Sequence, residues 1–148
     1  MDTRNKSSHA ACHEAVPFSH DARNVSRRES VLYVPRLDQM RGEFGIHFFD
    51  FIRGFQAKIT LHAEMIRLAA RENDTQQVAK ESHHLKNLCE QICLHQMGAL
   101  AAQIESIALT GNLQGIKHLV EKLIRAGLVA HVELTKFCSS CNKLGRTR

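Results

Sequence analysis

Residues 75 to 94 read TQQVAKESHHLKNLCEQICL, and this stretch decides the fold of the chain. Its apolar or small residues recur alternately four and three positions apart, which is the spacing of one face of an α-helix rather than of a strand. The residues on this face are Val78, Ser82, Leu85, Cys89 and Ile92. The stretch therefore predicts an amphipathic helix with one side in a core.

Three further segments show the same periodicity. A long stripe runs from Phe44 to Ala69, and two others run from Met97 to Ala108 and from Ile116 to Phe137. The breaks between them are short and polar, with Asn73 or Asp74 as a candidate N-cap. Short connections place consecutive helices antiparallel, so we predict an all-α fold: an antiparallel four-helix bundle with a short additional N-terminal helix near residues 37 to 44.

Composition and helical periodicity divide the chain into three parts. Residues 1–34 contain Pro17 and many polar residues without sustained periodicity, so we expect a flexible N-terminal segment. Residues 35–138 form the predicted bundle, and residues 139–148 form a basic C-terminal tail. A chain of 148 residues with 43% apolar content can bury one ordinary core.

Charge and hydropathy exclude some classes of protein. The net charge is +5, but the excess lies in residues 1–36 and 136–148, and the centre is nearly neutral. We therefore expect a solvated basic tail and no nucleic-acid partner, since a groove-reading helix needs its charge on one ordered face. No apolar run is long enough to cross a bilayer and the N-terminus is polar, so we expect a cytoplasmic protein without a membrane partner.

The five cysteines are an odd number and are scattered along the chain. This pattern is typical of reduced cytosolic proteins rather than of a disulfide framework. Cys138 and Cys141 form a single CxxC, which we interpret as two tail thiols. A zinc site completed by Cys12 or by nearby histidines, or a redox clasp, is the alternative.

The helix around residue 83 has a polar face beside its apolar one. His83 lies mid-helix on this face, together with Lys80, Lys86, Asn87 and Glu90, because residues three, four and seven apart lie over one another. We predict that the imidazole of His83 is accessible to solvent, with Lys86 within one turn.

The segment from Ser82 to Asn87 is similar to the signature of histidine phosphotransfer (HPt) domains. In that signature a small residue, the phospho-accepting histidine, any residue, leucine, lysine and usually glycine follow in order on the second helix of a four-helix bundle. The resemblance covers about residues 37 to 137. It implies that His83 is the phospho-acceptor, that Lys86 lies near the phosphate and that Leu85 is buried.

The resemblance also implies a function and its partners. The protein would take a phosphoryl group from the receiver domain of a hybrid sensor histidine kinase and pass it to a response regulator. It would be a monomeric carrier without a cofactor and without autonomous catalytic activity, since magnesium would sit on the receiver domain. A neutral imidazole is a competent nucleophile towards an activated acyl phosphate.

The sequence departs from the family pattern at Asn87, where glycine is usual. A side chain one turn beyond His83 can crowd the imidazole or hydrogen-bond to it. The alternative function is accordingly a degenerate HPt-like bundle that docks two-component proteins without phosphotransfer. Candidate docking residues in either case are Lys80, Asn87, Glu90 and Phe51, which falls off the main apolar stripe.

Glu81 and His84 also form a Glu-x-x-His pair, which supplies metal ligands in ferritin-like bundles. Such a site needs a second copy of the motif and further inward-facing glutamates, and the sequence contains no second copy. We therefore expect no metal site and treat His84 as structural or partly exposed.

Overall fold

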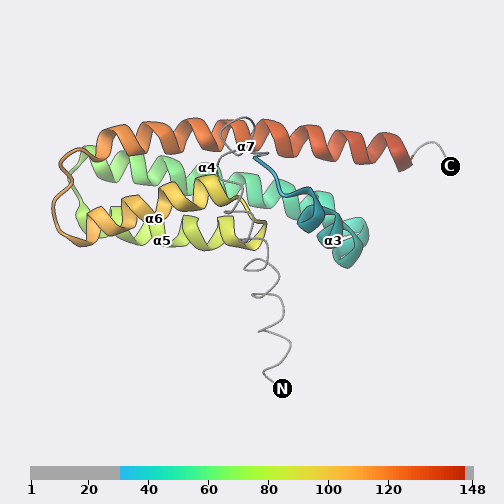
Figure 1. Cartoon of the computed structure of the whole chain (residues 1–148), viewed down its shortest axis with the longest axis horizontal. Coiled ribbons are helices and arrows are strands. Elements are labelled where there is room, and N and C mark those ends of the chain that lie inside the picture. Colours follow the sequence, from blue (N-terminus) through green and yellow to red (C-terminus); the bar gives the residue numbers. More distant parts are fainter. Residues whose placement is uncertain (1–30, 146–148) are drawn as a thin grey trace, which may run out of the picture. The chain divides into compact units, whose positions relative to one another are not determined.

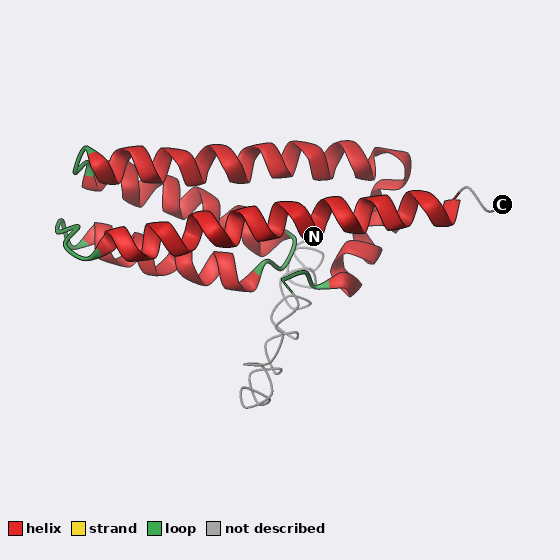
Figure 2. Cartoon of the chain, turned by 90° about the horizontal axis from the view of Figure 1, so that it is seen from above, coloured by secondary structure: helices red, strands yellow, loops and turns green. Residues whose placement is uncertain are grey.

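The computed structural model describes residues 31–145, and within them every regular element is a helix (Figure 2). The helices are α3 (Val34–Phe44), a 3-10 turn η2 (Gly45–His47), α4 (Phe48–Arg71), α5 (Thr75–Gln91), α6 (His95–Leu109) and α7 (Ile116–Gly145). None of them is long and apolar enough to cross a membrane. Residues 1–30 and 146–148 lie outside the described part.

Four of these helices form the bundle. α5 packs against α4 and α6, and α7 packs against α4 and α6, so neighbours along the chain are also neighbours in space (Figure 1). α3 lies at the end of the bundle where α4 begins. The predicted all-α antiparallel bundle with an additional short helix is confirmed.

The connections from α4 to α5 and from α5 to α6 begin with the same kind of helix C-terminus. After α4, Asn73 has a positive φ of 56° and the amide of Asp74 donates to the carbonyl of Ala69; after α5, Cys93 has a φ of 57° and the amide of Leu94 donates to the carbonyl of Cys89. A left-handed residue followed by this hydrogen bond closes the helix and turns the chain back. The loops thereby fix α4, α5 and α6 side by side.

Asp74 is the N-cap of α5, one of the two candidates that the sequence offered. Its side chain accepts a hydrogen bond from the amide of Gln77 at 3.1 Å. This contact satisfies one of the free amides at the start of the helix.

The core contains the predicted face of each bundle helix. Val78, Ser82, Leu85, Cys89 and Ile92 are all nearly inaccessible to solvent. The largest contributions from the other elements are Leu37, Phe48, Ile52, Ile66, Ile104, Leu123 and Leu134.

Two expectations about the ends of the bundle differ from the structure. Phe44 was expected at the start of the long core stripe, but it belongs to α3 and is 40% exposed, because Gly45 with φ of 55° ends that helix. At the other end, α7 continues past residue 138 to Gly145, so residues 139–145 are helical. Leu32 is buried and α3 starts at Val34, so the core and the first described helix also begin before residue 35.

Candidate functional site

His83 lies in the middle of α5 with its side chain 53% exposed, as predicted from the face that it occupies. The adjacent positions Ser82 and Leu85 are completely buried, so the imidazole stands on the border between the core and solvent. The helix backbone holds it there, and about half of the side chain is open to solvent.

Glu105 on α6 orients the imidazole. Its Oε1 lies 2.8 Å from Nδ1 of His83, and its Oε2 accepts a hydrogen bond from Nζ of Lys86, also at 2.8 Å. A carboxylate can only accept, so Nδ1 of His83 carries the proton and Nε2 of the neutral ring keeps its lone pair. The contact therefore selects the tautomer of the neutral ring in which Nε2 is unprotonated.

The same contacts keep Glu105 ionised. Burial of its side chain, which is 16% exposed, raises the pKa, but hydrogen bonds from Lys86 and His83 outweigh that effect and hold the pKa below its usual value. The result is a carboxylate bridged by one ammonium group and one imidazole across the α5/α6 interface.

The candidate docking residues lie in two separate regions, on α5 and at the start of α4. Lys80, Asn87 and Glu90 are exposed on α5. No hydrogen bond between described residues joins Asn87 to His83, whose Nδ1 bonds to Glu105. The surface next to Lys86 is a shallow groove of about 210 Å³, and its α6 wall includes the small residues Gly98, Ala99 and Ala102.

Phe51 does not join this group. It is half-buried near the start of α4 and stacks on Phe44 of α3, with ring centroids 4.6 Å apart and planes at 14°. The α4 residue level with the site is His62, eleven positions further along the chain, which corresponds to roughly 16 Å of helix. Phe51 therefore closes the α3/α4 junction rather than flanking His83.

A second pair of imidazole and carboxylate lies on the other flank of α5. Glu81 is buried, and its carboxylate contacts Nδ1 of His62 on α4 at 2.5 Å and accepts from Nε2 of Gln77 at 2.8 Å. His84 stacks on His62 with ring centroids 5.6 Å apart. Glu81 of the Glu-x-x-His pair is thus engaged in helix packing, and residues 31–145 contain no group of three metal-ligating side chains.

Cys138 and Cys141 lie in helix α7 and not in a tail. Both are partly buried, and burial is the main cause that raises the pKa of Cys138. Cys12, the third candidate ligand, is outside the described residues.

Two contacts at the site were missed by sequence reasoning, which treated each helix alone. Glu105 had a detectable signal, because α5 and α6 are joined by a tight turn around residue 93 that places residue 83 opposite about residue 103. Glu105 is the acidic residue nearest that level. The contact between His62 and Glu81 had no comparable signal, since the register of α4 against α5 depends on packing.

Comparison with known proteins gives one structural match. No family model matches the sequence, and no curated protein matches it either. Among solved structures, the fold is similar to histidine-containing phosphotransfer protein B (HptB) from Pseudomonas aeruginosa PAO1, with a TM-score of 0.69 and 15% sequence identity. The match covers 74% of this chain and 95% of that one. The chain therefore has the fold of a histidine-containing phosphotransfer protein.

Proposed function

We propose that this protein is a phosphoryl carrier of a multistep phosphorelay and that Nε2 of His83 is the group that accepts the phosphate. The observation that supports this most directly is the contact between Nδ1 of His83 and Glu105 on a half-exposed ring. It leaves Nε2 of the neutral ring unprotonated, in a fold shared with a phosphotransfer protein.

The proposed donor is a receiver domain that carries an aspartyl phosphate. The lone pair of Nε2 attacks phosphorus, the bond between phosphorus and the aspartate oxygen breaks, and the aspartate leaves as a carboxylate. No proton has to leave Nε2, because its lone pair is already free. The reverse reaction with the aspartate of a response regulator returns the phosphoryl group and regenerates the neutral imidazole.

Glu105 and Lys86 are positioning residues in this proposal. The ring gains positive charge as the N–P bond forms, and the carboxylate bonded to Nδ1 offsets that charge. Lys86 in turn neutralises part of the carboxylate and stands one turn from the acceptor, where its ammonium group can attract the incoming phosphate. Magnesium would be held by the receiver domain, so this chain needs no metal ligands of its own.

The docking surface that we propose is the exposed face of α5 with the adjoining part of α6. Lys80, Asn87 and Glu90 lie on the exposed side of α5, and the groove next to Lys86 has a floor of small α6 residues. Small side chains there allow a partner to approach the imidazole closely. Phe51 is left out of the proposed surface because it packs at the α3/α4 junction.

The test is phosphorylation by a receiver domain. The purified protein is incubated with a set of receiver domains and their kinase, and label that is labile to acid and stable to base is mapped to a residue. We expect label on His83, no label in His83→Gln, and normal labelling in the matched control His84→Gln. Helical circular dichroism checks that both variants are folded.

A docking module without phosphotransfer gives the opposite result. It would bind receiver domains without acquiring label, and His83→Gln would leave binding and function in cells intact. Label retained in His83→Gln would also refute the assignment of the acceptor.

A further inference from the structure

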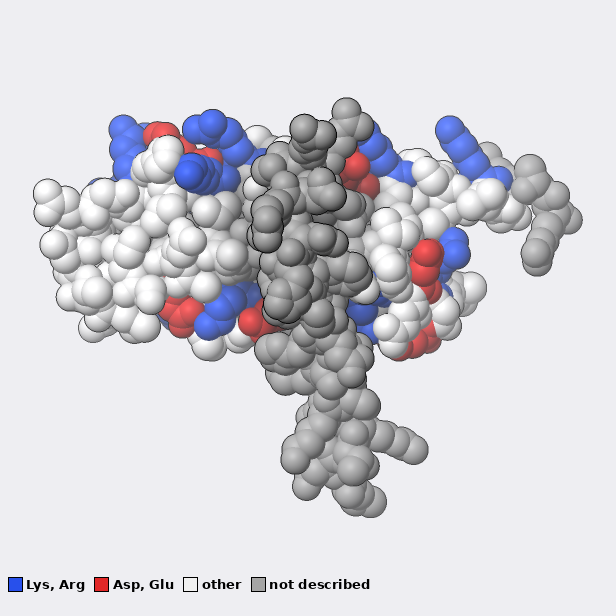
Figure 3. All heavy atoms as spheres, viewed as in Figure 1, with Lys and Arg blue, Asp and Glu red and all other residues white. Residues whose placement is uncertain are grey.

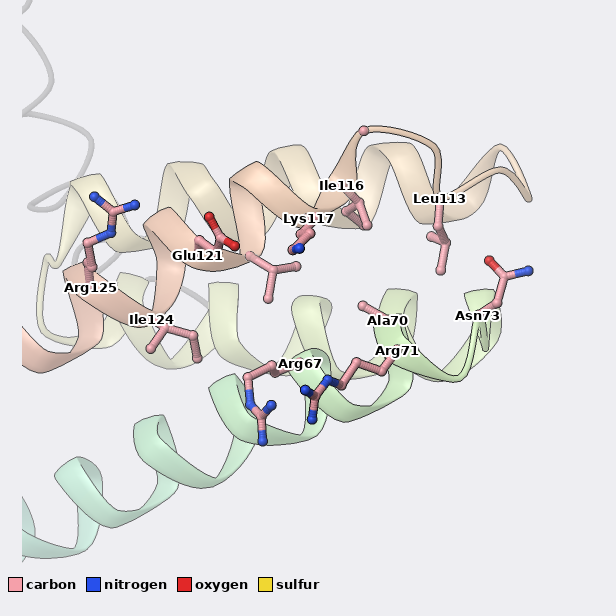
Figure 4. Close-up of a pocket in the computed structure, with 12 residues that line it drawn as sticks. Arg67, Ala70, Arg71, Asn73, Leu113, Ile116, Lys117, Glu121, Ile124 and Arg125 are labelled. Atoms are coloured by element: carbon pink, nitrogen blue, oxygen red, sulfur yellow. The ribbon is translucent and has the colours of Figure 1, made fainter.

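A second cavity lies on the opposite side of the bundle from His83. It has a volume of about 750 Å³ and is formed by the last turns of α4, the loop before α7 and the first turns of α7 (Figure 4). His83 and Glu105 lie on α5 and α6, whereas this cavity lies between α4 and α7. The two sites therefore share no side chain.

The floor of the cavity is apolar. Leu113, Ile116 and Val120 are core residues whose edges reach it, and the partly buried Ala70 and Ile124 complete it. Leu68, one residue after Arg67, and Leu128, three residues after Arg125, are exposed by 45% and 64%. The two helices that form the cavity thus also carry exposed apolar side chains outside its lining.

The rim is strongly positive. Arg67, Arg71, Lys117 and Arg125 line the cavity, against a single lining carboxylate, Glu121. Figure 4 shows the guanidinium groups of Arg67 and Arg71 next to each other on α4, with Lys117 on the facing α7. On the face drawn in Figure 3, much of the surface is uncharged, and positive and negative side chains lie close together along its upper and lower edges.

Glu64 compensates part of this charge, because it pairs with Arg67 and also attracts Arg71. Arg67 is held by Glu64 through both of its nitrogens, Nε at 2.9 Å and one terminal nitrogen. None of the ion pairs between described residues involves Arg71, Lys117 or Arg125. Arg71 and Lys117 lie on the two facing helices, whereas Figure 4 shows the guanidinium group of Arg125 directed away from α4.

We infer that the cavity between α4 and α7 binds a small amphiphilic anion, with an apolar chain on the floor and a carboxylate or phosphate head group at Arg71 and Lys117. The volume lies in the range of small-molecule sites, about 300 to 1,000 Å³. Arginine pairs with both kinds of head group through two parallel hydrogen bonds. A bare anion would leave the floor in water, and a cationic amphiphile would meet like charge.

The probes are dodecanoate and dodecyl phosphate, each titrated below its micelle-forming concentration and followed by calorimetry. Dodecyltrimethylammonium has the same chain with the opposite charge, and inorganic phosphate has the head group without the chain. We expect saturable 1:1 binding of at least one anionic probe and at least about tenfold weaker binding of both comparison compounds.

Three variants test the location. Lys117→Glu should weaken binding of the anionic probe by at least about tenfold, whereas Lys122→Glu, an exposed lysine of the same helix outside the cavity, should change it less than about twofold. Ala70→Leu adds apolar volume in the floor and should weaken binding without any change of charge. All three residues are exposed or partly buried, and thermal unfolding checks that each variant is folded.

Several results would overturn the inference. Equal binding of dodecyltrimethylammonium would show non-specific adsorption, and equal binding of inorganic phosphate would show a simple anion site. Binding to vesicles of phosphatidylglycerol without binding of either single-chain probe would show a membrane contact instead. An unchanged affinity in Lys117→Glu, or no binding of any probe, would equally refute it. Receiver-dependent labelling of His83 is unaffected by any of these outcomes.

Discussion

Oε1 of Glu105 lies 2.8 Å from Nδ1 of His83, across the interface between α5 and α6. The contact joins the proposed acceptor to a helix that carries no residue of the signature. It makes the electronic state of the imidazole depend on how two helices pack, and not only on the sequence of α5.

Replacement of Glu105 by glutamine tests this dependence. The amide keeps the size of the side chain but removes the negative charge that offsets charge on the phosphorylated ring. We expect phosphoryl transfer from a receiver domain to slow by about tenfold or more, the effect found when carboxylates that orient metal-ligating histidines are replaced. Rapid-quench measurement of label on His83 gives the rate.

The control is Glu72→Gln, which removes an exposed carboxylate at the end of α4. It should transfer at the normal rate. Equal rates in Glu105→Gln and the unmodified protein would mean that the contact does not assist transfer.

Stability should depend on pH through Glu105. Its pKa is lower in the folded protein than in the unfolded chain, because the hydrogen bonds from Lys86 and His83 outweigh burial. The stabilisation is therefore fully present above the unfolded pKa, about 4.3, and is lost as the pH falls through the folded pKa. Denaturant unfolding of the protein and of Glu105→Gln between pH 7 and pH 3 measures it.

We expect the difference in unfolding free energy between the two proteins to be constant at neutral pH and to shrink below about pH 4. A difference that grows on acidification would show that the carboxylate is destabilised in the folded state.

Asn87→Gly tests whether the departure from the family pattern affects transfer. Asn87 is exposed one turn beyond His83, on the side where a receiver domain would approach. Removing its side chain should speed transfer, while the lower helix propensity of glycine should cost less than about 1 kcal/mol of stability. Asn87→Ala separates the two effects, because it also shortens the side chain but keeps the helix stable. Transfer at an unchanged or lower rate in both variants would dismiss crowding by Asn87.

Two glycine replacements test the packing that brings Glu105 to His83. A Cβ added at Gly98 of α6 would lie 3.3 Å from Cβ of Cys89 on α5, so the helices would have to separate slightly. Overpacking costs about 1 to 3 kcal/mol and the gain in helix propensity offsets about 0.5 to 1 kcal/mol, so we expect Gly98→Ala to destabilise the protein by up to about 2 kcal/mol. The matched change Gly54→Ala meets no atom within 4 Å and should stabilise α4 by about 0.5 to 1 kcal/mol. Chemical denaturation of both variants checks the contrast, and similar effects would contradict close packing at Gly98.

Periodicity predicted the core faces because each bundle helix buries one stripe against its neighbours. The same argument misplaced Phe44, whose helical spacing to Phe48 and Ile52 continues across a break in the backbone. The break occurs at Gly45 with its positive φ, and spacing alone does not detect it. The end of α7 was set too early for a related reason, since the polar residues after 138 contain no glycine or proline before Gly145.

The residues of the candidate site also differ in whether the sequence predicts their positions. His83, Lys86 and the buried Leu85 follow from the register of a single helix, and their placement was predictable. Glu105 and the pair of His62 and Glu81 depend on the register between helices, which the pattern of one helix does not contain. Cys93 is also unexpected, because a left-handed backbone usually selects glycine or asparagine and its side chain is buried.

The two pairs of imidazole and carboxylate have a mechanical consequence for α5. Glu81 is bonded to His62 of α4 on one flank, while His83 and Lys86 are bonded to Glu105 of α6 on the other. An apolar face alone tolerates a small rotation of a helix about its axis, since hydrophobic contacts have little directionality. Hydrogen bonds on both flanks do not, because any rotation lengthens at least one of them. These hydrogen bonds therefore restrict rotation of α5 about its axis, and the direction in which His83 points is set by contacts on both flanks of the helix.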